Sequence, residues 1–230
     1  MDKRFLAILG IVVVALGGLL IFGGKNDNTN GGGDTKNVQP TNYTYGEGKS
    51  GVVLIEYGDF QCPACKQYYP WVEQLREKYK EQITFQFRHF PLDNIHPNAR
   101  ASHRAAEAAG RQGKFWEMYQ KLYEGQESWS DSTNARSIFD GYAKEIGLDL
   151  NRFKTDFASQ VTNNKINADQ AEGKKAEVNS TPTFVLNGQK IENPRGLDDF
   201  DKLIAEAIAA KNPGGSDATA PGYISDPIAQ

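Results

Sequence analysis

The chain has 230 residues, of which 39% are hydrophobic and 24% are charged, as is ordinary for a globular protein. Its formal net charge of -3 lacks the basic surplus that nucleic-acid-binding proteins usually carry, so we expect no nucleic acid partner. It has only two cysteines, and its histidines, His89, His96 and His103, do not fall at the usual spacing of metal ligands, so no metal site is predicted.

The N-terminal segment is long and apolar. Residues 5–24 are an uninterrupted run of apolar residues and glycines, which as a helix spans a bilayer core of about 30 Å. Lys3 and Arg4 precede the run and favour an N-terminus in the cytoplasm. We therefore predict a single-pass transmembrane anchor at residues 1–24, with the rest of the chain on the extracytoplasmic side of the cell membrane. The alternative, a cleaved signal peptide, would have a shorter apolar core and a small-x-small cleavage site.

Two segments have the composition of unfolded chain. Residues 25–48 are rich in Asn, Gly, Thr and Asp, and we predict that they form a flexible linker. Residues 212–230 are rich in Gly, Pro, Ser and Asp, and we predict a disordered tail. Residues 49–211 are left as one domain, which is long enough to bury a sizeable core.

The domain begins with a strand, a helix and a second strand. Val52–Tyr57 is a short apolar run rich in β-branched residues, as expected of a central strand. Apolar residues recur at helical spacing in Lys66–Lys80, and Ile83–Arg88 alternates as a strand does. This order implies a parallel pair of strands joined by a crossover helix.

A helical block follows, over about residues 98–178. Its predicted helices are Ala99–Ala109, Lys114–Tyr123, Asn134–Ile146, Leu150–Phe157 and one within Val161–Glu177. Trp116, Tyr119 and Tyr123 recur at helical spacing in the second of these, so we expect them to contribute to the core.

The last part of the domain contains a hairpin and a helix. Thr183–Leu186 is a predicted strand, Asn187-Gly188 is a strong hairpin turn signal, and Gln189–Glu192 is the returning strand. Leu197–Ala210 is an amphipathic helix. The complete order predicts an α/β protein: a thioredoxin fold with a helical insertion between a βαβ half and a ββα half.

The two cysteines form the motif Cys62-Pro63-Ala64-Cys65, between the first strand and its helix. The helix N-terminus stabilises an anion, so we expect the pKa of Cys62 to lie below its free value of about 8.5. Stabilising the thiolate makes the disulfide more oxidising. Pro63 suits the first helical turn, whereas Ala64 lacks the charge that a histidine would add, which predicts less extreme oxidising power. The alternative, an inert disulfide, closes too short a loop to stabilise the fold much.

Two further positions complete the predicted site. Glu56 precedes Cys62 by six residues on the first strand, where its carboxyl could relay a proton to or from Cys65; the alternative is a solvated glutamate. Thr181-Pro182 precedes a strand, and a cis proline there would leave backbone groups free to pair with a bound peptide. The alternative is a trans proline at the start of an edge strand.

In their order along the chain, several motifs resemble the DsbA-like branch of the thioredoxin superfamily. The matching pieces are Tyr57–Cys65, Arg88–Leu92, His96–Ala99 and Ser180–Phe184. The resemblance implies that Cys62 is the exposed nucleophile, Cys65 the buried resolving thiol and Glu56 the buried acid. It also implies that Thr181-Pro182 is the cis-proline loop. With Pro63 and Ala64, this loop would line the substrate groove.

The resemblance also implies partners. Members of this branch oxidise cysteine pairs in newly exported polypeptides through a mixed disulfide. They are reoxidised by a membrane protein of the DsbB or vitamin K epoxide reductase type, and they bind no metal or organic cofactor. His89 follows the second predicted strand and could approach the site, but we interpret it as a structural histidine.

Three functions remain open at this stage. The first is an oxidase that introduces disulfides into exported proteins. The second is a reductase or isomerase on the same fold, because the Cys62–Cys65 motif does not determine the direction in which electrons are transferred. The third is a non-catalytic module that binds unfolded peptides in the groove near Pro182.

Overall fold

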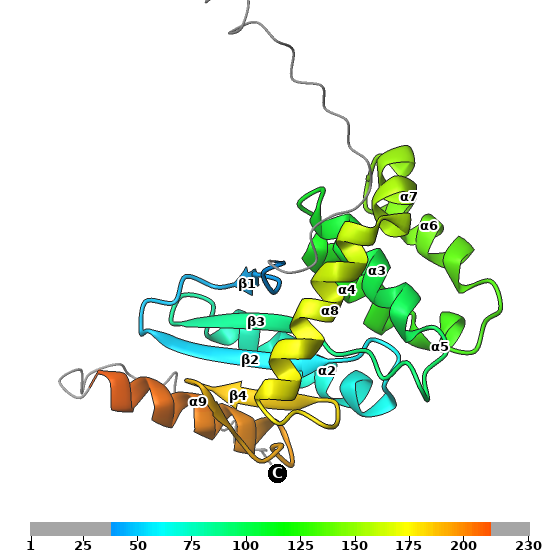
Figure 1. The fold of residues 1–230 in the computed structure, drawn as a ribbon. Coiled ribbons are helices and arrows are strands. Elements are labelled where there is room, and N and C mark those ends of the chain that lie inside the picture. Colours follow the sequence, from blue (N-terminus) through cyan, green and yellow to red (C-terminus); the bar gives the residue numbers. More distant parts are fainter. Residues whose placement is uncertain (1–37, 213–230) are drawn as a thin grey trace, which may run out of the picture. The chain divides into compact units, whose positions relative to one another are not determined.

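A five-stranded mixed sheet organises residues 38–212, the part of the chain that the computed structural model describes (Figure 1). The strands are β1 (Tyr43–Tyr45), β2 (Val52–Gly58), β3 (Ile83–His89), β4 (Thr183–Leu186) and β5 (Gln189–Lys190). Their order across the sheet is β1-β3-β2-β4-β5. Strands β2 and β3 are parallel and the other neighbouring pairs are antiparallel, so the predicted βαβ and ββα halves meet at β2 and β4.

One face of the sheet is covered by two helices. Helix α2 (Pro63–Lys78) connects β2 to β3, and α9 (Leu197–Lys211) follows the hairpin. Their buried side chains share a core with the sheet, which includes Leu54, Val72, Leu75, Phe85, Phe200 and Ile204. Helix α2 begins earlier than the predicted Lys66, because Pro63 fits the first turn and the Cys62 carbonyl already accepts the Lys66 N–H at 3.1 Å.

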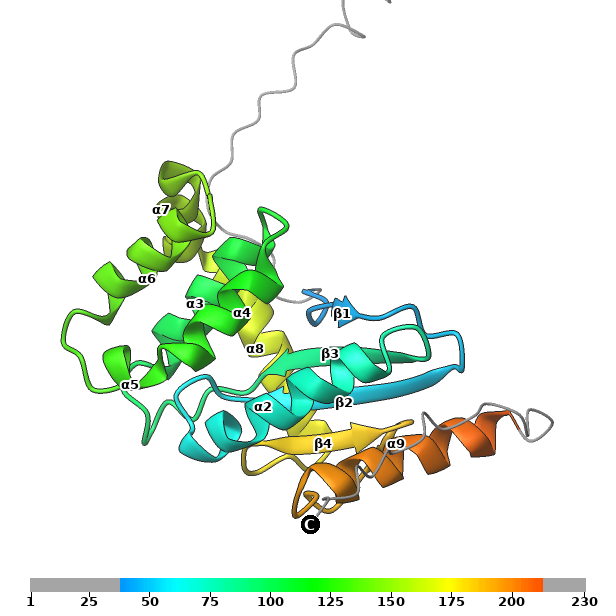
Figure 2. The same cartoon turned by 180° about the vertical axis from the view of Figure 1, so that it is seen from behind.

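The helical insertion lies between β3 and β4. It contains α3 (Ala99–Gly110), α4 (Phe115–Glu124), α5 (Gln126–Trp129), α6 (Ala135–Glu145), α7 (Leu150–Ala158) and α8 (Gln160–Lys175). Helix α8 returns across the sheet on the face opposite to α2, as Figures 1 and 2 show from the two sides. The predicted thioredoxin fold with a helical insertion is confirmed. Only α5 has no counterpart among the predicted helices, because four residues are too few to establish a helical period.

The β4–β5 hairpin has the turn that its sequence predicts. Asn187 and Gly188 both have positive φ angles, of 52° and 82°. A two-residue turn of type I′ needs this conformation at both positions, which glycine adopts freely and asparagine tolerates. The turn pairs Leu186 with Gln189 and so fixes the register of the hairpin.

The linker prediction for residues 25–48 is wrong where the structure describes that segment. Tyr43–Tyr45 is strand β1, which pairs with β3. The Tyr43 ring stacks on Phe115 with a centroid distance of 3.8 Å, and the Thr41 N–H donates to Asp169 at 2.7 Å. These contacts are made to distant parts of the chain, so they cannot be predicted from the polar composition of the segment itself.

Other parts of the predicted domain organisation lie outside the described residues. These are the anchor at residues 1–24, the first part of the linker up to residue 37, and the tail from residue 213 onward. Within residues 38–212, no helix is both long enough and apolar enough to cross a membrane.

Candidate active site

The Cys62-Pro63-Ala64-Cys65 motif lies at the start of α2, shortly after β2. Cys62 is the N-cap residue, with extended backbone angles (φ -68°, ψ 123°), and its N–H donates to the Asp59 carbonyl at 3.0 Å. Cys65 lies in the first helical turn, and both cysteines carry free thiols. The Cys62 sulfur is therefore at the end of the helix where backbone N–H groups lack helical partners.

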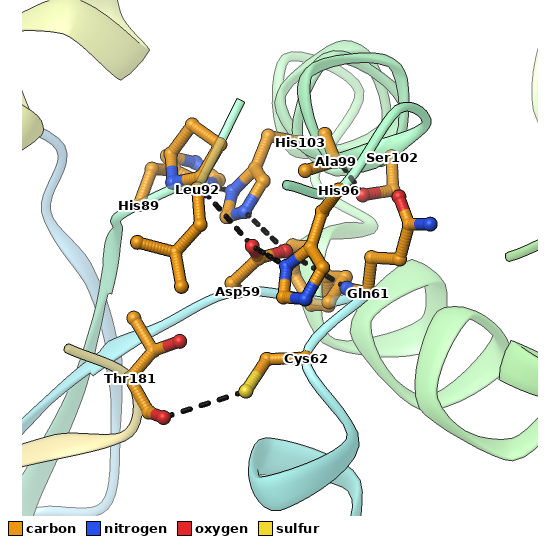
Figure 3. A network of polar contacts seen from close by, with 12 residues as sticks. Asp59, Gln61, Cys62, His89, Leu92, His96, Ala99, Ser102, His103 and Thr181 are labelled. Carbon is orange, nitrogen blue, oxygen red and sulfur yellow. Dashed lines mark hydrogen bonds and ion pairs between the residues drawn. The ribbon is translucent and has the colours of Figure 1, made fainter. Parts of the chain in front are cut away.

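Cys62 is less open to solvent than the sequence predicts. Its exposed fraction is 7%, and Cys65 is completely buried. The Thr181 carbonyl lies over the Cys62 sulfur and accepts a hydrogen bond from the thiol at 3.4 Å (Figure 3). The prediction of an exposed nucleophile is wrong in degree, because a loop 119 residues further along the chain packs against this sulfur.

The pKa of Cys62 is lowered to about 6. The largest cause is a hydrogen bond from the Cys65 thiol. The pKa is lowered further by Thr181 and by the backbone N–H groups of Cys65 and Ala64, whereas burial alone would raise it. The Thr181 hydroxyl is buried and has no hydrogen-bond partner within residues 38–212, so it can donate to the thiolate once that forms. The direction agrees with the expectation for a sulfur at a helix N-terminus.

Cys65 is shifted in the opposite direction. Burial raises its pKa well above the ordinary value, and its hydrogen bond to Cys62 and the nearby Glu56 raise it further. The Asp59 N–H donates to the Cys65 sulfur at 3.5 Å. At neutral pH, Cys62 is therefore the ionised and nucleophilic sulfur of the pair, and Cys65 keeps its proton.

Glu56 is buried on β2, so the alternative of a solvated glutamate is wrong. Its exposed fraction is 1%, and the Tyr119 hydroxyl donates to Oε2 at 3.4 Å. Burial raises the pKa of Glu56 to about 8. The carboxyl is close enough to both cysteines for their charges to interact, so a group able to hold a proton at neutral pH lies beside the dithiol.

The remaining predicted site residues surround the Cys62 sulfur. Thr181–Pro182 is a cis peptide, and both residues are buried. Pro63 is exposed and Ala64 is half-buried at the start of α2. The predicted site residues thus come from β2, the start of α2 and the loop before β4. Figure 3 shows the Cys62 sulfur facing the Thr181 carbonyl.

Three amide side chains that sequence reasoning missed attach the cysteine loop to the insertion. Gln126 of α5 donates to the carbonyls of Phe60 and Cys62, at 2.6 and 3.1 Å. Gln61 accepts the Asn98 N–H at 2.7 Å, and Asn98 in turn donates to three carbonyls after α5 and at its end. No sequence signal identifies this amide latch, Gln61, Asn98 and Gln126, because its members are far apart in the chain.

A buried carboxylate organises the loop from the other side (Figure 3). Asp59 accepts hydrogen bonds from the N–H groups of Gln61 and Leu92, at 2.8 and 2.9 Å, and from Nδ1 of His96, at 2.7 Å. Nε2 of His103 lies 3.7 Å from its Oδ1. Burial alone would raise the pKa of Asp59, but its contacts with His103 and His96 and the Leu92 N–H lower it.

All three histidines belong to this network. Nδ1 of His103 lies 2.6 Å from Nδ1 of His89, and Nε2 of His89 lies 3.0 Å from a Glu107 carboxylate oxygen. Burial lowers the pKa of His103 to about 4. Both ring nitrogens of His89 have partners, which confirms its interpretation as a structural histidine. Tyr119 and Tyr123 are fully buried and Trp116 partly buried, as expected of core residues.

No group of histidine, cysteine, aspartate and glutamate side chains within residues 38–212 is arranged to hold a metal ion.

Comparisons with known proteins agree with this fold. The family model described as Thioredoxin matches residues 38–206. Crystal structures of similar fold include BdbD from Bacillus subtilis, at 20% identity and a TM-score of 0.65 over 74% of this chain and 96% of that one. Another is alpha-DsbA1 from Wolbachia pipientis, at 17% identity and a TM-score of 0.65 over 76% of this chain and 95% of that one.

Curated relatives include the Na(+)/H(+) antiporter NhaA 1 of Mycobacterium sp. (strain KMS), which is 35% identical over 154 residues. The match covers 65% of this chain and 24% of the relative, so the chain spans about a quarter of the length of the curated relatives it matches. The fold and the pair of free thiols define a thioredoxin-fold protein with a helical insertion. The chain belongs to the thioredoxin family, whose model covers most of its length.

Proposed function

We propose that the protein oxidises cysteine pairs in exported polypeptides through a mixed disulfide at Cys62. The observation that carries this proposal is the opposite shift of the two thiols, with the pKa of Cys62 lowered to about 6 and that of Cys65 raised. A stabilised Cys62 thiolate favours the reduced protein, which makes the Cys62–Cys65 disulfide a stronger oxidant.

The reaction starts from the oxidised protein. A substrate thiolate attacks the Cys62 sulfur, a substrate–Cys62 disulfide forms, and Cys65 leaves with the electron pair and takes up a proton. A second substrate thiolate then attacks the first substrate sulfur, and Cys62 leaves as a thiolate. The substrate gains a disulfide and the protein becomes a dithiol. The low pKa of Cys62 makes it a good leaving group in the second step.

Glu56 and the cis-proline loop support these steps. Glu56 has a pKa of about 8, so its carboxyl group can deliver a proton to the Cys65 thiolate and recover one afterwards. The Thr181–Pro182 loop, which lies beside the Cys62 sulfur, aligns the substrate backbone together with Pro63 and Ala64.

The test joins three measurements. We expect the reduction potential of the Cys62–Cys65 pair to lie above about -200 mV; a value near about -270 mV would indicate a reductase. We expect the alkylation rate of Cys62 to rise with pH through a midpoint near 6, because only the thiolate reacts. A reduced substrate protein should refold faster with the wild-type chain, and Cys62→Ser should remove that acceleration. Undiminished acceleration by the variant would leave only the peptide-binding function.

For the location, we propose that residues 1–24 anchor the chain in the cell membrane, with the domain outside. The apolar run after Lys3 and Arg4 supports this proposal. A membrane protein of the DsbB or vitamin K epoxide reductase type would then reoxidise the dithiol. Deletion of residues 1–24 is expected to release the domain from the membrane fraction of cells. Equal amounts of the full-length and the truncated chain in the membrane fraction would contradict the anchor.

A further inference from the structure

A groove of about 600 Å³ borders the start of α2 on the side of the helical insertion. Its walls include Pro63, Lys66, Ile95, His96, Glu127 and Asp131. Ile95 is 68% exposed, which is unusual for a large apolar side chain in this domain. The groove therefore combines an apolar contact with an imidazole, next to the turn that carries Cys62.

The His96 ring has a fixed orientation. Its Nδ1 lies 2.7 Å from Oδ2 of Asp59, and that oxygen also accepts the Leu92 N–H at 2.9 Å. An ionised carboxylate only accepts hydrogen bonds, so Nδ1 of His96 carries a proton and Nε2 of the neutral ring carries the lone pair. Nε2 has no hydrogen-bond partner within residues 38–212, and 15% of the side chain is accessible. A histidine held in one tautomer by a buried carboxylate, with its other nitrogen open, has the arrangement of a general base.

We propose that His96 is the base that accepts the proton of the incoming substrate thiol. The proposal rests on the oxidase function above. The thiol S–H bond breaks, its proton moves to Nε2 of His96, and the sulfur attacks Cys62 of the Cys62–Cys65 disulfide. A substrate–Cys62 bond forms as the Cys62–Cys65 bond breaks, Cys65 leaves with the electron pair and takes up a proton, and the His96 proton is later lost to solvent. The oxidant is the disulfide of the protein itself.

Charged groups from several elements surround the His96 ring. Besides Asp59, the charged groups that line the groove are Lys66 of α2, Glu127 of α5 and Asp131 after α5. His103 of α3 lies on the far side of Asp59. In the oxidised protein Cys62 is part of a disulfide and does not titrate, so the histidine acts on the substrate thiol.

The test compares wild type with His96→Asn. The asparagine amide N–H can replace Nδ1 as the donor to Asp59, but it provides no base at the position of Nε2. The measurement is the rate constant for oxidation of a dithiol peptide by the oxidised protein, from about pH 5 to about pH 9. We expect the variant to be about tenfold slower near pH 6 and to approach wild type near pH 9, where the peptide thiol ionises unaided. Added imidazole should restore part of the rate of His96→Gly at low pH.

Each outcome decides the proposal. A loss of equal size at every pH, without rescue by imidazole, would indicate a structural role and overturn it. A variant as fast as wild type throughout would overturn it as well. If the wild-type protein itself failed to oxidise the peptide, the proposed function would be wrong, which this series distinguishes from a wrong assignment of His96. A urea unfolding curve of each variant separates a folding defect from a catalytic one.

Discussion

Replacement of Cys65 by serine is expected to turn a transient mixed disulfide into a stable one. The Cys62 thiolate of this variant can still attack a disulfide between a single-cysteine model substrate protein and a small thiol, which leaves. With Cys65 replaced, neither protein then has a second thiol to release the product. Cys62→Ser is the matched control, because its remaining thiol is completely buried and its pKa is raised. We expect nearly complete adduct with Cys65→Ser and almost none with Cys62→Ser at neutral pH.

The adduct is measured on a non-reducing gel, where it migrates at the summed mass of the two proteins and disappears on addition of reductant. The yield of Cys65→Ser should fall as the pH drops below the Cys62 pKa of about 6, although loss of the Cys65 hydrogen bond will raise that value somewhat. Equal adduct with both variants would reverse the assignment of nucleophile and resolving thiol. Absence of adduct with either would remove the mixed disulfide from the mechanism.

Glu56→Gln is expected to produce the largest change in stability. The pKa of Glu56 is raised from 4.5 to about 8 in the folded protein, so its stabilising contribution is complete below pH 4.5 and is lost as the pH rises through about 8. Glutamine does not ionise, and it avoids this loss. The variant should gain about 3 kcal/mol over wild type at pH 7 and on the order of 5 kcal/mol above pH 8.

Urea unfolding of both proteins at several pH values measures this difference. The two must share one redox state, because Cys62 in the reduced protein contributes in the opposite sense, with stability that is lost as the pH falls through about 6. Glu206→Gln, on the exposed surface of α9, is the control for the substitution itself. A constant difference between Glu56→Gln and wild type across pH would mean that Glu56 ionises as an exposed glutamate does.

Much of the fold can be predicted from local patterns. The β-branched run of β2 and the Asn187-Gly188 turn each specify their own geometry, because the determining contacts lie within a few residues. Strand β1 could not be predicted in this way. It has three residues, and its stability depends on pairing with β3 and on the stacking of Tyr43 on Phe115.

The candidate site also has one part that local sequence patterns predict and another that depends on tertiary contacts. Cys62, Cys65 and Glu56 could be predicted because a strand followed directly by a helix places them together. The histidine network could not, since His89 lies on a strand, His96 in a loop and His103 on a helix. His96 and His103 contact Asp59 directly, and His89 joins them through His103. The position of Asp59 in the sequence motif gives no sign of these contacts. The near closure of the Cys62 sulfur by Thr181 is likewise a product of tertiary packing.

The amide latch connects helix α5 of the insertion to the backbone of Cys62. Gln126 belongs to the insertion, and its side chain donates a hydrogen bond to the Cys62 carbonyl. A protein that bound α5 and displaced it would therefore also displace the Cys62 backbone, without contacting the sulfur. By thermodynamic reciprocity, whatever binds α5 more tightly in one oxidation state must favour that state by the same free energy. Binding at α5 would in this way be coupled to the oxidation state of the dithiol.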